Sequence, residues 1–170
     1  MSPRLVLVGP PGSGKTTIGT AIAARLGLPM HDTDSAVERT AGRPVAEIFT
    51  TEGEAVFRRL EEQAVLTALA TETGVVSLGG GAVLSARTRS ALAGHVVVFL
   101  AVGMADGVRR TGLGTARPLL AGLHPRATFQ ALLEARLPLY REVATVEVRT
   151  DGRSPSEVVE AVLAELPTQS

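Results

Sequence analysis

A glycine-rich stretch near the start of the chain carries residue types suited to binding polyphosphate. Residues 9–16 read GPPGSGKT and fit the pattern G-x-x-x-x-G-K-[ST], between an apolar segment and an expected helix. In such a loop glycines let N–H groups turn towards phosphate oxygens, a lysine reaches the outer phosphates, and the next hydroxyl can ligate magnesium. The pattern predicts a site for a nucleoside triphosphate with Mg²⁺, and the alternative is a strand–turn–helix junction without a ligand. The predicted nucleotide contacts here are Gly12, Ser13, Gly14, Lys15, Thr16 and Thr17.

Lys15 is the single lysine among 17 basic residues, and all the others are arginine. A compact ammonium fits a phosphate cradle in which a planar guanidinium would be too large and too directional. The use of lysine at this one position therefore supports a phosphate site.

Two aspartates stand at the end of an expected strand over residues 29–31. Asp32 and Asp34 are two positions apart, and on an extended backbone such side chains point the same way. Carboxylate oxygens suit Mg²⁺ and can accept the proton of an attacking hydroxyl. The alternative is a turn in which an aspartate acts only as a local cap.

A run of three glycines, Gly79, Gly80 and Gly81, ends another expected strand. Three consecutive glycines cost backbone entropy, so the run indicates a ligand that approaches the main chain closely. A tight turn between strand and helix is the alternative, although it accounts for one glycine more readily than for three.

Strands and helices are expected to alternate along the whole chain, which is typical of a parallel sheet covered on both faces. The expected strands are 4–8, 29–31, 75–78, 96–101 and 145–148. The expected helices are 15–26, 34–41, 45–49, 52–71, 86–92, 104–110, 128–141 and one after Ser154. The fold class is therefore α/β, with three layers in which a five-stranded, mainly parallel sheet lies between helices.

Two helix starts are predicted from capping residues. Ser154 followed by Pro155 and Glu157 should begin the last helix, and Thr51 with Glu54 should cap the helix over 52–71. Residues 111–126 fit neither helical nor strand periodicity. A loop of this length is usually a working element, and the alternative is a disordered loop with incidental arginines.

Composition excludes several classes of protein. The chain has 170 residues, no net charge and no cysteine, which fits one domain over 1–170 and a cytoplasmic location. Neutral charge argues against nucleic acid or an anionic membrane as partner. The apolar run at 96–102 is much shorter than the roughly 20 residues that a membrane span needs.

Together the motifs resemble those of the shikimate kinases, small P-loop proteins related to the nucleoside monophosphate kinases. The resemblance runs from Arg4 to Leu166 without large gaps. The phosphate loop alone is shared by a very large superfamily, whereas the other motifs in combination are far more specific. The matching segments are GPPGSGKTT (9–17), DTD (32–34), FRRLE (57–61), LGGGAV (78–83), RRT (109–111), RPLL (117–120) and RLPLYREVA (136–144).

The resemblance implies transfer of the terminal phosphate of ATP to the 3-hydroxyl of shikimate, a step of chorismate and aromatic amino acid biosynthesis. It implies that Asp32 and Thr16 hold Mg²⁺, and that Asp34 binds the accepting hydroxyls as a general base or by orientation alone. Lys15, Asp34 and Arg117 would then be the catalytic residues. A monomer is expected.

The resemblance also assigns the carboxylate of shikimate to Arg58 and Arg136, because a guanidinium fork matches a carboxylate. Glu61 lies three residues after Arg58 on the same side of a helix and could hold it. For either arginine alone, a surface salt bridge is the alternative. Residues 79–81 would line the same substrate site, with the Gly80 amide facing it. Either ring of Phe49 and Phe57 could wall the substrate or pack in a helical core.

The remaining assignments concern the nucleotide. Arg117 would close over ATP as part of a lid at 111–126, and Arg110 at its base would be a second phosphate contact. Arg153 matches a position that touches adenine, although a solvent-facing charge is the alternative. The helical segment 34–61 would bind the substrate.

Two other functions remain open. Another small P-loop kinase, acting on gluconate or a nucleotide, would share the phosphate loop but not the full motif set. A nonenzymatic ATP-binding regulatory module would bind ATP without turnover.

Overall fold

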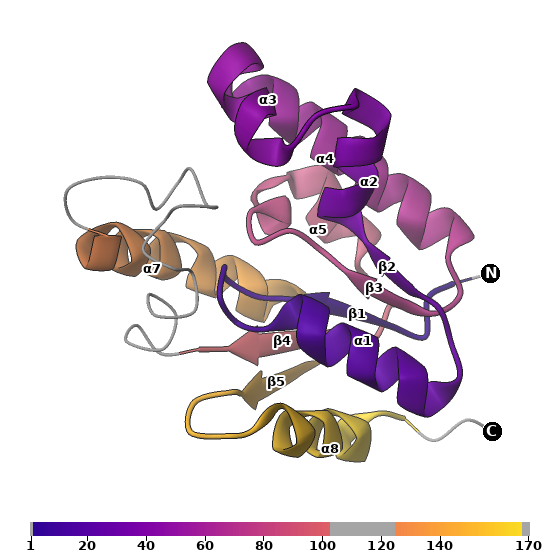
Figure 1. The fold of residues 1–170 in the computed structure, drawn as a ribbon. Helices are drawn as coiled ribbons and strands as arrows, with labels where there is room; N and C mark the ends of the chain where they lie inside the picture. The colour runs from indigo at the N-terminus through magenta and orange to yellow at the C-terminus, as the bar shows by residue number, and fades with distance from the viewer. Residues whose placement is uncertain (1, 103–124, 168–170) are drawn as a thin grey trace.

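In a computed structural model of the chain, which describes residues 2–102 and 125–167, five parallel strands form one sheet (Figure 1). The strand order is β2-β3-β1-β4-β5. The strands are β1 (Leu5–Val8), β2 (Met30–Asp32), β3 (Val75–Ser77), β4 (Val97–Ala101) and β5 (Val146–Arg149). The expected α/β fold with a five-stranded sheet is confirmed.

Helices fill the connections between the strands. They are α1 (Lys15–Leu26), α2 (Thr33–Ala41), α3 (Val45–Glu52), α4 (Glu54–Thr71), the short 3₁₀ helix η1 (Ala82–Leu84), α5 (Ala86–Ala91), α7 (Pro125–Val143) and α8 (Pro155–Glu165). None of the described helices is both long and apolar enough to cross a bilayer.

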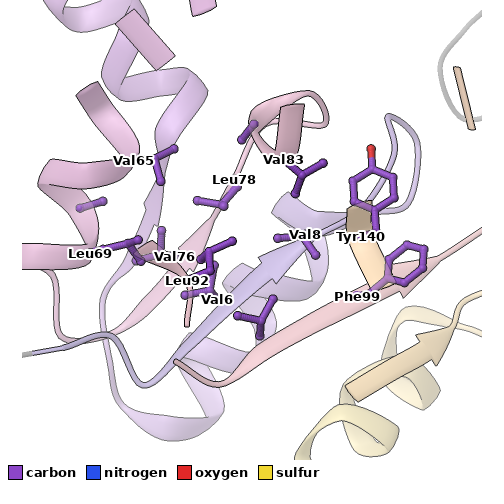
Figure 2. Close-up of a cluster of buried hydrophobic side chains, with 13 residues drawn as sticks. Val6, Val8, Val65, Leu69, Val76, Leu78, Val83, Leu92, Phe99 and Tyr140 are labelled. Atoms are coloured by element: carbon purple, nitrogen blue, oxygen red, sulfur yellow. The ribbon is translucent and has the colours of Figure 1, made fainter. Parts of the chain in front are cut away.

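Alternate residues of β1 face the two layers of helices. Leu5 and Leu7 belong to the core that packs against α1 and α8. Val6 and Val8 belong to the core on the other face, with residues of α4, α5 and α7, part of which is drawn in Figure 2. All four side chains are buried. This period of two along a fully buried strand is what a sheet covered on both faces requires.

A third, smaller core joins α2, α3 and α4 at the β2 end of the sheet (Figure 1). Val37, Ile48 and Phe57 are its buried members. Phe57 is only 3% exposed, and Phe49 lies beside it with ring centroids 4.7 Å apart. Phe57 is therefore part of a helical core, which was one of the two interpretations of the sequence.

Several expected boundaries differ from the structure. The capping box at Thr51 is wrong, because α3 continues through Glu52 and the Thr51 hydroxyl donates to the Glu47 carbonyl inside that helix. Gly53, with a φ of 88°, makes the break between α3 and α4. By contrast, the box formed by Ser154 and Glu157 is present at α8.

Two further differences are shifts of a few residues. The strand expected at 29–31 lies at 30–32, and α7 begins at Pro125, so residues 125–126 belong to this helix and not to the loop. Proline suits a first helical turn because its missing N–H has no partner there. The expected helix 104–110 and residues 111–124 of the expected lid lie outside the described residues.

Candidate functional site

The phosphate loop connects β1 to α1. Gly14 is the residue before α1 and has a φ of 88°, a left-handed conformation that favours glycine. A side chain on Gly9 would place its Cβ 2.6 Å from the Leu100 carbonyl oxygen of β4. The Lys15 ammonium donates to the carbonyl oxygens of Gly9 at 2.7 Å and Pro10 at 3.1 Å. The loop thus holds its lysine within the curve that the glycines create.

The phosphate loop, the two aspartates and the glycine run meet in one cavity of about 350 Å³. They do so because each follows the carboxyl end of a strand, and β2, β3 and β1 are neighbours in the sheet. This edge is where ligands bind in open parallel sheets. The lining residues are Gly12, Gly14, Lys15, Thr16, Thr17, Asp32, Asp34, Ser77, Leu78, Gly79 and Gly80.

Asp32 and Asp34 reach this cavity by a different geometry from the one expected. Asp32 ends β2, and α2 begins at the next residue, so the backbone between the two aspartates is not extended. The Asp34 N–H donates to Asp32 Oδ1 at 2.9 Å, which makes Asp32 the N-cap of α2. Asp32 therefore caps α2 and also lines the cavity.

The second carboxylate oxygen of Asp32 faces the phosphate loop. The Thr16 hydroxyl donates to Asp32 Oδ2 at 3.3 Å. A hydroxyl and a carboxylate oxygen together are hard donors of the kind that Mg²⁺ takes beside the phosphates of a nucleotide. The donor set therefore fits Mg²⁺.

Thr33, between the two aspartates, has a part that the sequence did not indicate. It is fully buried, and its hydroxyl donates to the Ser77 carbonyl at 3.4 Å and accepts from the Gly79 N–H at 3.2 Å. Thr33 thus ties the start of α2 to the end of β3. The only signal in the sequence was its place inside the D-T-D motif.

The three glycines after β3 (Gly79, Gly80 and Gly81, here called the glycine turn) have close neighbours and do not have a positive φ. A Cβ at Gly79 would lie 2.5 Å from Asp34 Oδ1, and one at Gly80 would lie 2.9 Å from Pro11 Cδ. A Cβ at Gly81 would lie 2.6 Å from Arg58 Cζ. Other side chains thus occupy the space beside this turn.

Arg58 projects from α4 and is fixed by two carboxylates. It pairs with Glu61 at 2.8 Å and with Glu54 at 3.2 Å, and its guanidinium lies over the rings of Phe49 and Phe57. The contact with Glu61 was expected from the spacing of three residues. Burial raises the pKa of the Glu61 carboxyl, an effect that its ion pair with Arg58 opposes.

Arg136 and Tyr140 lie one turn apart on α7, and both are buried. The Tyr140 hydroxyl donates to the Gly80 carbonyl at 2.5 Å. Arg136 interacts with that same hydroxyl, and its charge also acts on Glu61. Burial makes a solvated surface ion pair the wrong interpretation of Arg136. The structure therefore brings Arg58, Glu61 and Arg136 around the glycine turn.

Burial raises the pKa of Tyr140 to about 12, from an ordinary value of 10.0. Because a raised folded-state pKa favours the protonated form, the stability that this group contributes is complete below pH 10.0 and is lost as the pH rises through about 12. Tyr140 is the single tyrosine and the chain has no tryptophan, so tyrosinate absorbance reports this residue alone. We expect a midpoint near 12 in the folded protein and near 10.0 in protein unfolded by denaturant. Equal midpoints would contradict the burial of this hydroxyl.

Arg153 lies at a second hollow of about 270 Å³, beside the phosphate loop. This hollow shares Gly14 and Thr17 with the main cavity and is also lined by Ser13, Thr150 and Pro155. Arg153 is exposed there. The two predicted lid arginines, Arg110 and Arg117, lie outside the described residues.

Comparisons with known proteins agree on one family. The family model described as shikimate kinase matches residues 11–167. A shikimate kinase of Saccharopolyspora erythraea is 64% identical over 96% of this chain and 93% of its own length, and one of Salinispora tropica is 58% identical over 99% and 100%. The solved shikimate kinase of Acinetobacter baumannii in complex with shikimate superposes with a TM-score of 0.91, at 34% identity over 96% of this chain and 91% of that one.

Proposed function

The chain belongs to the shikimate kinase family, and from this we propose that the protein transfers the terminal phosphate of ATP to the 3-hydroxyl of shikimate in this cavity. The products are shikimate 3-phosphate and ADP. The observation that carries the proposal is that the phosphate loop, the two aspartates and the glycines after β3 line one cavity. Phosphoryl transfer asks the protein mainly to position two substrates and to stabilise charge. An arrangement that holds both substrates in contact meets that demand.

On the ATP side, the phosphate loop would bind the phosphates through its N–H groups. Lys15 would exchange its bonds to the Gly9 and Pro10 carbonyls for phosphate oxygens. Thr16 and Asp32 would hold Mg²⁺, which when bound neutralises charge on the phosphates. Mg²⁺ is proposed on the chemistry of these two donors.

On the shikimate side, Asp34 would hold the accepting hydroxyls. Arg58 and Arg136 would bind the carboxylate, because the Arg58 guanidinium lies beside Gly81 and Arg136 is buried on the side of α7 that carries Tyr140, whose hydroxyl contacts Gly80. Within the described residues the N–H of Gly80 has no hydrogen-bond acceptor, so it is available to the same ligand. A ring with hydroxyls at one end and a carboxylate at the other would be oriented by both ends.

The nucleotide assignments outside the phosphate loop are proposals from the family resemblance. Arg153 would contact adenine in the 270 Å³ hollow, which adjoins the phosphate loop. Arg110 and Arg117 would contact the phosphates from the lid. We also propose that one domain over 1–170, with substrate-binding segment 34–61, works as a cytoplasmic monomer. The lack of cysteine supports the location, and Leu84 is the one large apolar side chain exposed among the described residues.

An ADP-release assay with shikimate, gluconate and nucleoside monophosphates tests the acceptor. We expect turnover with shikimate alone, and turnover with only a nucleotide or gluconate would overturn the proposal. ATP binding without turnover on any acceptor would instead favour a regulatory module.

A substitution of Arg136 tests where the carboxylate of shikimate binds. Arg136→Ala should raise the KM for shikimate at least tenfold and leave the KM for ATP within about twofold, because a lost charged hydrogen-bond donor weakens only the ligand that it binds. Arg141→Ala is the matched control, since Arg141 lies on the same helix but is exposed and pairs with Glu147. An equal rise in both KM values for Arg136→Ala would remove Arg136 from the carboxylate site.

A further inference from the structure

A buried hydroxyl joins α7 to the glycine turn across 60 residues of sequence. The Tyr140 ring lies in the core beside Phe99 of β4, with centroids 5.0 Å apart, and Figure 2 shows its hydroxyl directed away from Phe99. That hydroxyl donates to the Gly80 carbonyl at 2.5 Å. The rest of this core is apolar, so the ring supplies packing and the hydroxyl supplies one directed contact.

The hydroxyl lies between a residue that lines the cavity and an arginine proposed to bind the acceptor. Gly80 lines the cavity itself. Arg136, four residues before Tyr140 and so on the same side of α7, is close enough for its positive charge to lower the pKa of the Tyr140 hydroxyl, against the larger effect of burial. The hydroxyl can accept from Arg136 while it donates to Gly80. Arg136, Tyr140 and Gly80 thus form a chain of contacts that ends at the glycine turn.

Fixing the Gly80 carbonyl has a geometric consequence. A trans peptide is planar, so the direction of this carbonyl sets the direction of the N–H of Gly81 on the other side of the plane. Three glycines in succession allow many backbone conformations, and none of the three is held in a helix or strand. A hydrogen bond to the middle residue restricts that freedom where the substrate must fit.

Pro138 makes such an anchor more important. It lies within α7, between Arg136 and Tyr140, and it has no N–H to donate to the carbonyl four residues earlier. The Glu134 carbonyl therefore lacks its partner within the helix. The Tyr140 hydroxyl gives this part of α7 a contact with the glycine turn that does not depend on the missing bond.

We propose that Tyr140 is a positioning residue of the acceptor site, which holds Arg136 and the Gly80 peptide in the geometry that binds the carboxylate of the acceptor. The inference rests on the proposed function, because it takes shikimate as the acceptor. Tyr140 acts through these two groups and does not itself touch the substrate. The effect of removing its hydroxyl must therefore appear on one substrate and not on the other.

Tyr140→Phe removes the hydroxyl and keeps the ring against Phe99. We expect the KM for shikimate to rise about tenfold, with the KM for ATP within about twofold of wild type, because one hydrogen bond to a positioned group is lost. Thr88→Val is the matched control. It removes another fully buried hydroxyl, from α5, and should change neither KM. A Tyr140→Phe protein with unchanged shikimate KM, or with both KM values raised equally, would overturn the inference.

A double substitution tests the route through Arg136. If Tyr140 acts by placing Arg136, then Tyr140→Phe in the Arg136→Ala background should raise the shikimate KM by clearly less than it does alone. If the two substitutions together raise the shikimate KM by the product of their separate effects, the route through Arg136 is overturned. If the wild-type protein turns over shikimate and Tyr140→Phe has the same shikimate KM, only this inference is overturned. If the wild-type protein does not act on shikimate, the proposed function is overturned as well.

The wild-type protein offers a second measurement that needs no Tyr140 variant. Because the single tyrosine is the sole source of tyrosine absorbance, its near-ultraviolet difference spectrum reports changes at this hydroxyl. Saturating shikimate should change that spectrum, and Arg136→Ala should abolish the change. An unchanged wild-type spectrum at a shikimate concentration that supports turnover would contradict the proposed contact.

Discussion

Replacing Lys15 by alanine should lower kcat/KM for phosphoryl transfer about 10³-fold. The ammonium is the one lysine charge in the chain, and it is placed in the curve of the phosphate loop by contacts with Gly9, Pro10 and Ser13. Removal of a positioned donor from a transferring group costs on the order of 10²–10³ in rate, and here a full positive charge is lost with it. Steady-state kinetics with saturating Mg²⁺ measure the effect.

Two controls separate chemistry from folding in this experiment. The Lys15 side chain is half-buried at the cavity and belongs to none of the three cores, so Lys15→Ala should keep the circular dichroism spectrum of the wild type. Lys15→Arg keeps the charge but places a planar group in a space shaped for an ammonium, and it should also lose most activity. A Lys15→Ala protein within tenfold of wild type would show that the loop binds phosphate without needing this charge.

Asp34→Asn should lower kcat about 10²-fold at saturating ATP, shikimate and Mg²⁺. Asparagine has the same shape and can still accept a hydrogen bond from a hydroxyl, but it cannot take a proton or carry charge. General base catalysis contributes 10²–10⁴ in favourable cases, and phosphoryl transfer with little bond formation to the nucleophile lies at the low end. Initial rates at saturation of all three components measure the loss.

Asp32→Asn is the comparison that makes this result specific. Asp32 contacts the Thr16 hydroxyl, so its replacement should raise the Mg²⁺ concentration required for half-maximal rate, and added Mg²⁺ should restore much of the activity. Added Mg²⁺ should not restore Asp34→Asn. A loss below tenfold for Asp34→Asn would mean that Asp34 only orients the hydroxyl, and rescue of both variants by Mg²⁺ would contradict the division of roles between them.

The parts of this fold that follow from local sequence were predictable. Ser154, Pro155 and Glu157 define the start of α8 because all their contacts lie within one turn. The phosphate loop was predictable for the same reason. The capping prediction failed at Thr51. Thr51 and Glu54 have the spacing of a capping box, but α3 continues past Thr51 and ends at Gly53, which has a positive φ.

The parts that depend on distant segments were not predictable from spacing alone. For Arg136, the spacing alone favoured a surface salt bridge and only the family resemblance assigned it to the site, because its burial depends on the fold. The hydroxyls of Thr33 and Tyr140 meet the glycine turn across 46 and 60 residues, and no periodicity encodes such contacts. The aspartates were correctly expected at one site for a wrong reason, since a helix start and not an extended strand brings them there.

The glycine turn has a consequence for how this chain can evolve. A Cβ on any of its three members would collide with another side chain: Asp34 for Gly79, Pro11 of the phosphate loop for Gly80 and Arg58 for Gly81. Gly79 also faces Glu61, which is the ion-pair partner of Arg58. A substitution at any of the three positions must therefore be accompanied by movement of a side chain that belongs to the phosphate loop, to the aspartate pair or to the Arg58–Glu61 ion pair.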